Sequence, residues 1–151
     1  MTKAIKLLTA LPQAQRERLM EQAHEVSFPE DTRIFEAGGT ADRFWVIRSG
    51  AVHLDQEVTS RRRVVVASLG AGDMLGWSWL FPPYEWDFGA VAFSNVRAYE
   101  FDGAAVLALC VEDPLLGLSL VRTVAEILAS RLETTRGKLL EQYAIRRRGP
   151  L

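Results

Sequence analysis

The sequence predicts a mainly β domain, a β-roll or jelly roll, with flanking helices and a long C-terminal helix. Three observations lead to this fold class: helical spacing of apolar residues before residue 28, six short strand-like segments between Thr32 and Phe101, and a long helical pattern after Asp113. The chain has 151 residues, which fits one domain that can bury a core without disulfides.

Composition and charge are those of an ordinary globular domain. The chain carries 18 Lys and Arg against 19 Asp and Glu, so its net charge is −1 and it is not built as a whole to neutralise phosphates. Cys110 is the only cysteine, which excludes an internal disulfide and is compatible with a reducing cytosol. No apolar run is long enough for a signal peptide or a membrane span. These features predict a cytoplasmic protein without membrane contact.

The N-terminal segment predicts two helices. Residues 3–11 have apolar side chains at helical spacing, and Pro12 suits the first position of a second helix. The expected inward face of that second helix consists of Leu19, Met20 and Ala23.

The middle of the chain alternates strand-like segments with turn signals. The turns are marked by Gly38-Gly39, Ser49-Gly50, Gly70 to Asp73 and Ser94-Asn95. Short strands at such regular spacing are typical of a sandwich, jelly roll or barrel. The predicted strands are Arg33–Phe35, Arg43–Arg48, Ala51–Gln56, Arg63–Leu69, Ala90–Ser94 and Val96–Phe101.

Two helices are predicted after the last strand. Asp102 is a suitable N-cap for a short helix that ends near Cys110, and Asp113-Pro114 has the form of an N-cap and first turn for a longer one. The longer helix reaches about Tyr143, which makes it roughly 30 residues and about 45 Å long. We expect it to fray or bend at Gly137, because a mid-helix glycine costs about 1 kcal/mol relative to alanine.

The long helix carries two apolar stripes in its first half. One stripe can dock on the roll, while a second at 4-3-4 spacing predicts a partner helix and hence a homodimer. The alternative is one helix whose wide apolar face is buried within its own chain. The dimer-helix candidates are Leu116, Leu120, Val124 and Ile127 on one stripe, and Val121, Ala125, Leu128 and Leu132, continued by Leu139 and Tyr143, on the other.

Several short motifs have the spacing of a known family. A leucine-rich turn at Leu8 to Leu11 precedes Phe28-Pro29 and Ile34-Phe35, although Asp31 stands where that family usually has glycine. With the order of the elements, the motifs resemble the cyclic-nucleotide-binding domain of the Crp/Fnr regulators over about residues 5 to 140. The longer motifs are Gly38-x-x-Ala41-Asp42-x-Phe44-Trp45-Val46-Ile47-x-x-Gly50-x-Val52, a central hairpin, and Gly72-Asp73-x-x-Gly76, the opening of a phosphate-binding cassette.

The resemblance implies one cyclic-nucleotide-binding-like domain over residues 1–151, and we expect no DNA-reading module. We expect N-terminal helices at 1–27, the β-roll at 28–101 with its cassette at 72–91, and C-terminal helices at 102–145. The family's regulators usually continue into a helix-turn-helix, whereas this chain stops at Leu151. The interpretation is a stand-alone domain for which we expect no direct DNA binding.

The three side chains that recognise the nucleotide in the family are replaced in this cassette. There, a glutamate after the second glycine holds the ribose hydroxyl, an arginine some ten residues later pairs with the phosphate, and a serine or threonine follows. Here these positions are Trp77, Asp87 and Phe88. Each lost charged hydrogen bond removes about 1.5–3 kcal/mol. A micromolar site would therefore weaken to the millimolar range or beyond, since about 1.4 kcal/mol is tenfold.

Aromatic residues fill the same stretch and leave three interpretations open. The rings fill the former pocket as core, or they line a pocket for a flat or apolar ligand with polar handles such as Ser78. The third interpretation is a cyclic nucleotide held by unusual contacts. The rings are Trp77, Trp79, Phe81, Tyr84, Trp86 and Phe88, and the pocket candidates are Gly76, Trp77, Ser78, Trp79, Leu80, Asp87, Phe88 and Gly89.

The remaining reactive or charged residues predict no chemistry. Cys110 is expected as a buried core thiol, and His24 and His53 lack the spacing of metal ligands, so we expect no metal and no cofactor. Arg61 to Arg63 are expected in a solvated turn, with a nucleic acid or an acidic partner as the alternative, and the same holds for Arg146 to Arg148.

We therefore predict a ligand-sensing or regulatory module with a diverged cassette rather than an enzyme, because no nucleophile with its base and no carboxylate pair is present. One alternative is a ligand-free dimeric scaffold for protein interactions. A second alternative is a cyclic-nucleotide receptor with atypical contacts.

Overall fold

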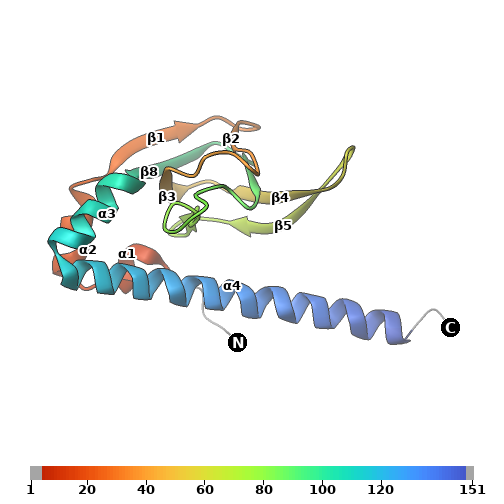
Figure 1. The fold of residues 1–151 in the computed structure, drawn as a ribbon. Coiled ribbons are helices and arrows are strands. Elements are labelled where there is room, and N and C mark those ends of the chain that lie inside the picture. Colours follow the sequence, from red (N-terminus) through yellow and green to blue (C-terminus); the bar gives the residue numbers. More distant parts are fainter. Residues whose placement is uncertain (1–4, 149–151) are drawn as a thin grey trace.

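Two short helices precede eight strands, and two further helices follow them (Figure 1). The structure, a computed structural model, describes residues 5–148 and the side chains of residues 5–145. The helices are α1 (Leu7–Ala10), α2 (Gln13–Met20), α3 (Gly103–Glu112) and α4 (Pro114–Arg148). The strands are β1 (His24–Phe28), β2 (Arg33–Phe35), β3 (Arg43–Ser49), β4 (Val52–Thr59), β5 (Arg62–Leu69), β6 (Met74–Leu75), β7 (Gly89–Ala92) and β8 (Val96–Asp102).

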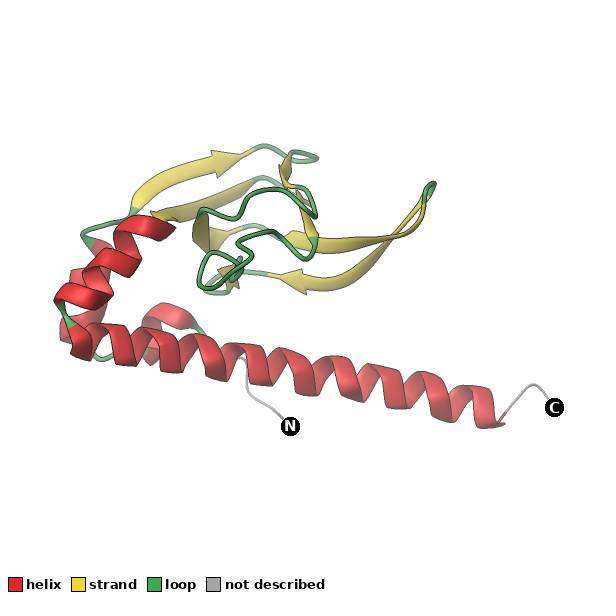
Figure 2. Ribbon diagram, in the orientation of Figure 1, coloured by secondary structure: helices red, strands yellow, loops and turns green. Residues whose placement is uncertain are grey.

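The strands form the predicted β-roll from two antiparallel sheets (Figure 2). One four-stranded sheet has the order β1-β8-β3-β6, and the other has the order β2-β7-β4-β5. The hairpin of β4 and β5 projects beyond the rest of the roll, on the side where α4 also extends (Figure 1). The predicted fold class is confirmed.

The sequence prediction missed two strands and overestimated the first helices. β1 begins within the range 1–27 that was assigned to helices, and β6 is only two residues long. β1 pairs with β8 alone, and its apolar alternation is limited to Val26 and Phe28, which is too short to mark a strand in the sequence. Among the described residues of 3–11 only Leu7–Ala10 are helical, and α2 ends at Met20, before Ala23.

The core has two parts, and β3 lies between them. Neighbouring side chains of a strand point to opposite faces. Phe44 and Val46 therefore join the cluster under the helices, while Trp45 and Ile47 join the cluster inside the roll. We call these the helix-side cluster and the roll cluster. Both faces of β3 are buried, which explains its continuous apolar run.

The predicted helix starts are confirmed by their caps. The Asp102 carboxylate accepts a hydrogen bond from the Ala105 amide at 3.1 Å, and the Asp113 carboxylate accepts one from the Leu116 amide at 3.2 Å. α4 spans 35 residues, which is about 52 Å. It runs past Tyr143 and continues through Gly137 as helix, so the expected end near Tyr143 is corrected.

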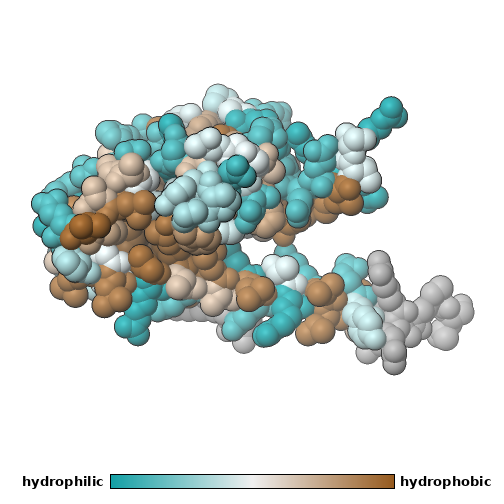
Figure 3. All heavy atoms as spheres, viewed as in Figure 1, coloured by the Kyte–Doolittle hydropathy of each residue, from teal (hydrophilic) through white to brown (hydrophobic). Residues whose placement is uncertain are grey.

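The two apolar stripes of α4 have different surroundings. Leu116, Leu120, Val124 and Ile127 are buried in the helix-side cluster. They pack on their own chain, and their assignment as dimer residues is therefore corrected. The other stripe is open except at Leu128, which packs partly on the helix-side cluster; Leu132, for example, is 69% exposed. Figure 3 shows apolar side chains on α4 where the helix extends beyond the roll.

Candidate functional site

Gly76, the second glycine of the cassette, directly follows β6 and combines a turn with a close contact. Its φ of +89° lies in the left-handed region that favours glycine. A Cβ at this position would lie 2.8 Å from an atom of the Trp86 indole ring. Gly76 therefore serves two purposes, because it allows the turn and it leaves room for the ring of Trp86.

Trp86 is held inside the roll. Its side chain is 6% exposed and stacks on Phe35, with ring centroids 4.0 Å apart and an interplanar angle of 15°. Its backbone amide donates to the Gly39 carbonyl at 2.9 Å, and its carbonyl accepts from the Gly38 amide at 2.8 Å. Ring and backbone are thus fixed together as part of the roll cluster.

The cavity that remains in the cassette is small. Its volume is about 20 Å³, which is room for about one water molecule. The structure brings five of the eight pocket candidates together around it: Gly76, Trp77, Ser78, Asp87 and Phe88. Trp86, Phe35 and Leu54 close it from the roll.

The other three candidates lie away from the cavity. Trp79 is buried in the helix-side cluster, where its ring stacks on Phe44 with centroids 4.5 Å apart and its indole N–H donates to the Gly76 carbonyl at 3.3 Å. Leu80 packs on the same cluster. Gly89 lies in β7 beside the ion pair of Arg33 and Asp55, and a Cβ there would collide with both side chains.

Arg131 is a cavity residue that the sequence analysis missed. It reaches the cassette from α4, and its guanidinium donates to the carbonyl oxygen of Met74, next to Gly76. Burial lowers the pKa of Arg131, although the charge of Asp73 opposes this effect. Its position was readable from the spacing, because it follows Ile127 by four residues and so continues the docked stripe of α4.

A part-buried ion pair between Arg33 and Asp55 lies beside Gly89 in β7. The Arg33 guanidinium donates to the Asp55 carboxylate, with one N–O distance of 3.0 Å. This bond is the main reason why the pKa of Arg33 is raised, and a bond to Glu36 adds to it. The pair connects β2 to β4 and supports the wall that carries Gly89.

The other residues singled out from the sequence form no common site. Cys110 is half-buried rather than buried, and burial raises the pKa of its thiol. His53 stacks on Phe93 at 4.0 Å, whereas His24 lies on β1. Arg63 pairs with Glu36 at 3.4 Å. The side chains of Arg146 to Arg148 lie outside the described residues.

The described part of the chain holds neither a cluster of metal ligands nor a membrane-spanning helix. Among residues 5–145 no group of three or more His, Cys, Asp or Glu side chains is placed to hold a metal ion. Within residues 5–148 no helix has the length and apolar character needed to cross a bilayer.

Comparison with known proteins identifies the family. Residues 25–113 match the cyclic nucleotide-binding domain family, and the chain belongs to it. A CRP-like cAMP-activated global transcriptional regulator from Mycobacterium tuberculosis is 28% identical over 123 residues, which are 82% of this chain and 53% of that protein. The chain thus spans about half the length of this curated relative.

Solved structures agree on the fold. A cyclic nucleotide-binding domain from Methylobacillus flagellatus superposes with a TM-score of 0.81 at 19% identity, covering 91% of this chain and 78% of that one. The N-terminal domain of a transcriptional regulator from Streptomyces coelicolor gives a TM-score of 0.70 at 24% identity, covering 82% and 88%. At these identities the likeness supports the β-roll with its long helix and nothing finer.

Proposed function

We propose that this chain is a non-catalytic, dimeric regulatory module of the cytoplasm whose cassette is closed by its own side chains and does not take cyclic nucleotides in the family's manner. The observation that carries this proposal is the cavity of about 20 Å³ next to the buried ring of Trp86. Ligand pockets for small molecules have volumes of about 300 Å³ or more. A nucleotide therefore has no room unless Trp86 leaves the roll cluster.

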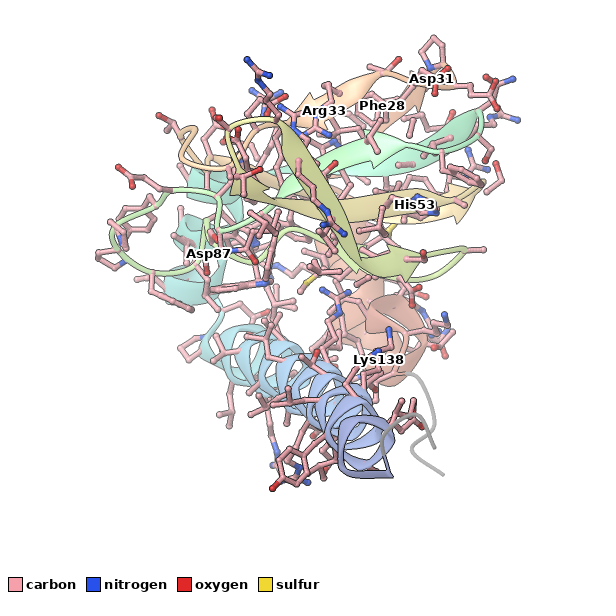
Figure 4. The ribbon with its side chains drawn as sticks, turned by 90° about the vertical axis from the view of Figure 1, so that its right-hand side faces the viewer. Phe28, Asp31, Arg33, His53, Asp87 and Lys138 are labelled. Atoms are coloured by element: carbon pink, nitrogen blue, oxygen red, sulfur yellow. The ribbon has the colours of Figure 1, made fainter. Side chains whose placement is uncertain are left out.

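The charges at the cavity support the same conclusion. Asp87 occupies the position at which the family resemblance implies a phosphate-binding arginine, and a carboxylate there repels a phosphate. Figure 4 shows Asp87 in the loop on the side of the roll nearer α4. Trp77 replaces the ribose-binding glutamate and packs against Phe81, with ring centroids 5.6 Å apart.

Arg131 connects the closed cassette to α4 without a ligand. Its hydrogen bond to the Met74 carbonyl joins the helix to β6, at the point where the cassette begins. The docked stripe of α4 ends at this contact, so the helix is fixed to the roll along its first half. We infer that α4 keeps one position whether or not a nucleotide is present.

The open stripe of α4 is the proposed dimer surface. Val121, Leu132 and Leu139 are exposed, and they belong to the stripe whose 4-3-4 spacing, from Val121 through Ala125 and Leu128 to Leu132, suits a second helix. A second copy of α4 would bury these side chains and leave the docked stripe unchanged. This arrangement suits a module that acts through protein contacts.

Restoring the missing side chains tests the closed cassette. The double variant Trp77→Glu with Asp87→Arg supplies the two recognition groups but leaves Trp86 in place. We expect it to gain no affinity for cyclic AMP in isothermal titration, whereas a triple variant that adds Trp86→Ala gains binding. Binding by the double variant alone would show that only side chains were lacking and would overturn the proposal.

A second candidate function rests on Arg131. A guanidinium at the cavity could replace the family's cassette arginine and bind the phosphate of a cyclic nucleotide by atypical contacts. In that case cyclic AMP would stabilise the protein, and Arg131→Met would abolish the stabilisation. The closed cassette predicts no stabilisation by cyclic AMP in either protein.

A further inference from the structure

A larger cleft opens on the roll outside the cassette. It lies where the β1–β2 region meets the loop between β2 and β3, and its volume is about 310 Å³. Such a volume is at the lower end of the range found for small-molecule sites. Figure 4 places Phe28 and Arg33, which mark this part of the roll, on the side away from α4.

Four aromatic rings form one wall of the cleft: Phe28, Phe35, Trp45 and Trp86. Phe35 lies between the two indoles, with ring centroids 5.7 Å from Trp45 and 4.0 Å from Trp86. Phe28 meets Trp45 edge to face at 6.2 Å. Phe28 and Phe35 are half-buried, so part of each ring is accessible from the cleft. Trp45 and Trp86 are only 3% and 6% exposed, so Phe28 and Phe35 supply the aromatic surface that a ligand can contact.

Among the side chains that line the cleft, carboxylates outnumber cations. Glu36, Asp42 and Glu100 line the cleft, whereas Arg43 is the one lining cation. Arg43 is shared, with N–O distances of 3.0 Å to Asp42 and 3.3 Å to Glu100. Glu100 also accepts a hydrogen bond from the Trp45 indole at 2.9 Å.

Two further groups complete this charge distribution. Asp102 acts on Arg43 as well, so that one guanidinium faces three carboxylates. Glu36 is paired separately, with Arg33 at 2.7 Å and Arg63 at 3.4 Å. The Trp45 end of the cleft therefore keeps an excess of negative charge beside an aromatic surface.

We propose that this cleft binds a planar organic cation, an aromatic amidinium or ammonium compound, with its ring against the accessible parts of Phe28 and Phe35 and its positive group at Glu100. The carboxylates attract the positive group, and the two phenylalanine side chains shield the apolar ring of the ligand from water. An anion of the same shape meets three carboxylates and is repelled. The inference goes beyond the proposed function, because the cleft is separate from the small cavity of the cassette.

The cleft also touches the residues that close the cassette. Phe35 and Trp86 line both spaces, so these two rings separate the cleft from the small cavity. A ligand on this wall would restrain Trp86, which contacts Gly76 and thereby the start of the cassette. A ligand bound in the cleft would therefore influence the cassette through Trp86 and so regulate the module.

Three probes of the same shape and different charge test the inference: benzamidinium, benzamide and benzoate. Each is titrated into the ¹⁵N-labelled full chain at up to millimolar concentration. The readout is the indole N–H signal of Trp45, assigned by its loss in Trp45→Phe. We expect benzamidinium to shift this signal saturably, benzamide to bind about tenfold more weakly, and benzoate to cause no shift.

Variants locate the positive group. Glu100→Gln keeps an acceptor for the Trp45 indole but removes the charge, and should weaken benzamidinium about tenfold without affecting benzamide. Asp42→Asn, at an exposed side chain, provides the same test if Glu100→Gln disturbs the fold. Glu57→Gln on the β4–β5 hairpin removes an equal charge elsewhere and should change nothing.

Equal affinity for the three probes, the absence of saturation, or equal weakening by Glu57→Gln would each overturn the inference. The amide signal of Gly76 keeps this result separate from the proposed function. A shift of that signal with cyclic AMP would contradict the closed cassette and leave the cleft unaffected.

Discussion

At the scale of single residues, the closure of the cassette depends on Trp86. The ring occupies space that Gly76 provides, and its stack on Phe35 ties it to the roll cluster. Substitution at the recognition positions that the family resemblance implies would by itself leave an open pocket with low affinity for a nucleotide. In the proposed account, the ring of Trp86 also blocks that pocket sterically.

Trp86→Ala should strongly destabilise the protein. Removing a large buried aromatic side chain costs about 3–5 kcal/mol, which urea unfolding measures as a lower free energy of unfolding. Phe81→Ala is the control, because Phe81 is 45% exposed and should lose under about 1 kcal/mol. Similar losses for the two variants would mean that Trp86 is not a core residue.

Cys110 should react slowly for a cysteine. Burial, together with the charge of Asp113, raises the pKa of its thiol, so the reactive thiolate is scarce at pH 8. Rates of alkylation by iodoacetamide, measured against pH, should rise at higher pH in the native protein than in the urea-unfolded chain.

The sign of the linked stability effect follows from the same shift. Because the folded pKa is the higher one, the thiol's contribution to stability is complete below the unfolded pKa and is lost as pH rises through the folded value. Coinciding alkylation profiles of native and unfolded protein would contradict the burial of Cys110.

At the scale of elements, α4 combines two contacts on different faces. The docked stripe holds it to the roll, Arg131 fixes it at the cassette, and the open stripe is left for a partner. The helix extends beyond the roll, which leaves room for a second chain beside its distal half (Figure 1).

Leu132→Glu should convert the proposed dimer to a monomer, because it places a charge in the helix–helix contact without touching the core. Light scattering at micromolar concentration measures the mass. Val111→Glu on α3 is the matched control, since Val111 is 82% exposed and lies outside the stripe. A monomeric native protein, or a dimer that tolerates Leu132→Glu, contradicts the assignment.

Local signals in the sequence sufficed for most elements. Asp102 and Asp113 marked the helix starts because capping is a contact between near neighbours. The prediction missed β1 because only two apolar residues of this edge strand, Val26 and Phe28, alternate with polar ones. The helical spacing of the docked stripe predicts the position of Arg131, but only if the pattern is extended to a charged residue as well as to apolar ones.

The candidate site was less predictable, because its shape depends on segments distant in the sequence. The aromatic residues of 77–88 separate in the fold: Trp79 joins the helix-side cluster and Trp86 the roll cluster. The sequence could not show that division, nor the cleft, whose wall joins Phe28, Phe35, Trp45 and Trp86. These positions come together only when the two sheets pack against each other.

At the scale of the whole molecule, the two clusters and α4 form one connected arrangement. β3 contributes side chains to both clusters, and so does the cassette, through Trp79 and Trp86. Arg131 joins the cassette to α4. In the proposed account, side chains of the chain itself fill the cassette, and α4 keeps its position in the absence of nucleotide.

The most direct test of the closed cassette is the thermal unfolding midpoint of the native protein with cyclic AMP or cyclic GMP at millimolar concentration. A ligand at 100 times its Kd stabilises by about 2.7 kcal/mol, which is several degrees for a domain of this size. We predict no shift with either nucleotide. A rise of several degrees would show that the cassette opens and binds nucleotide despite Trp77, Trp86 and Asp87, and would contradict the account.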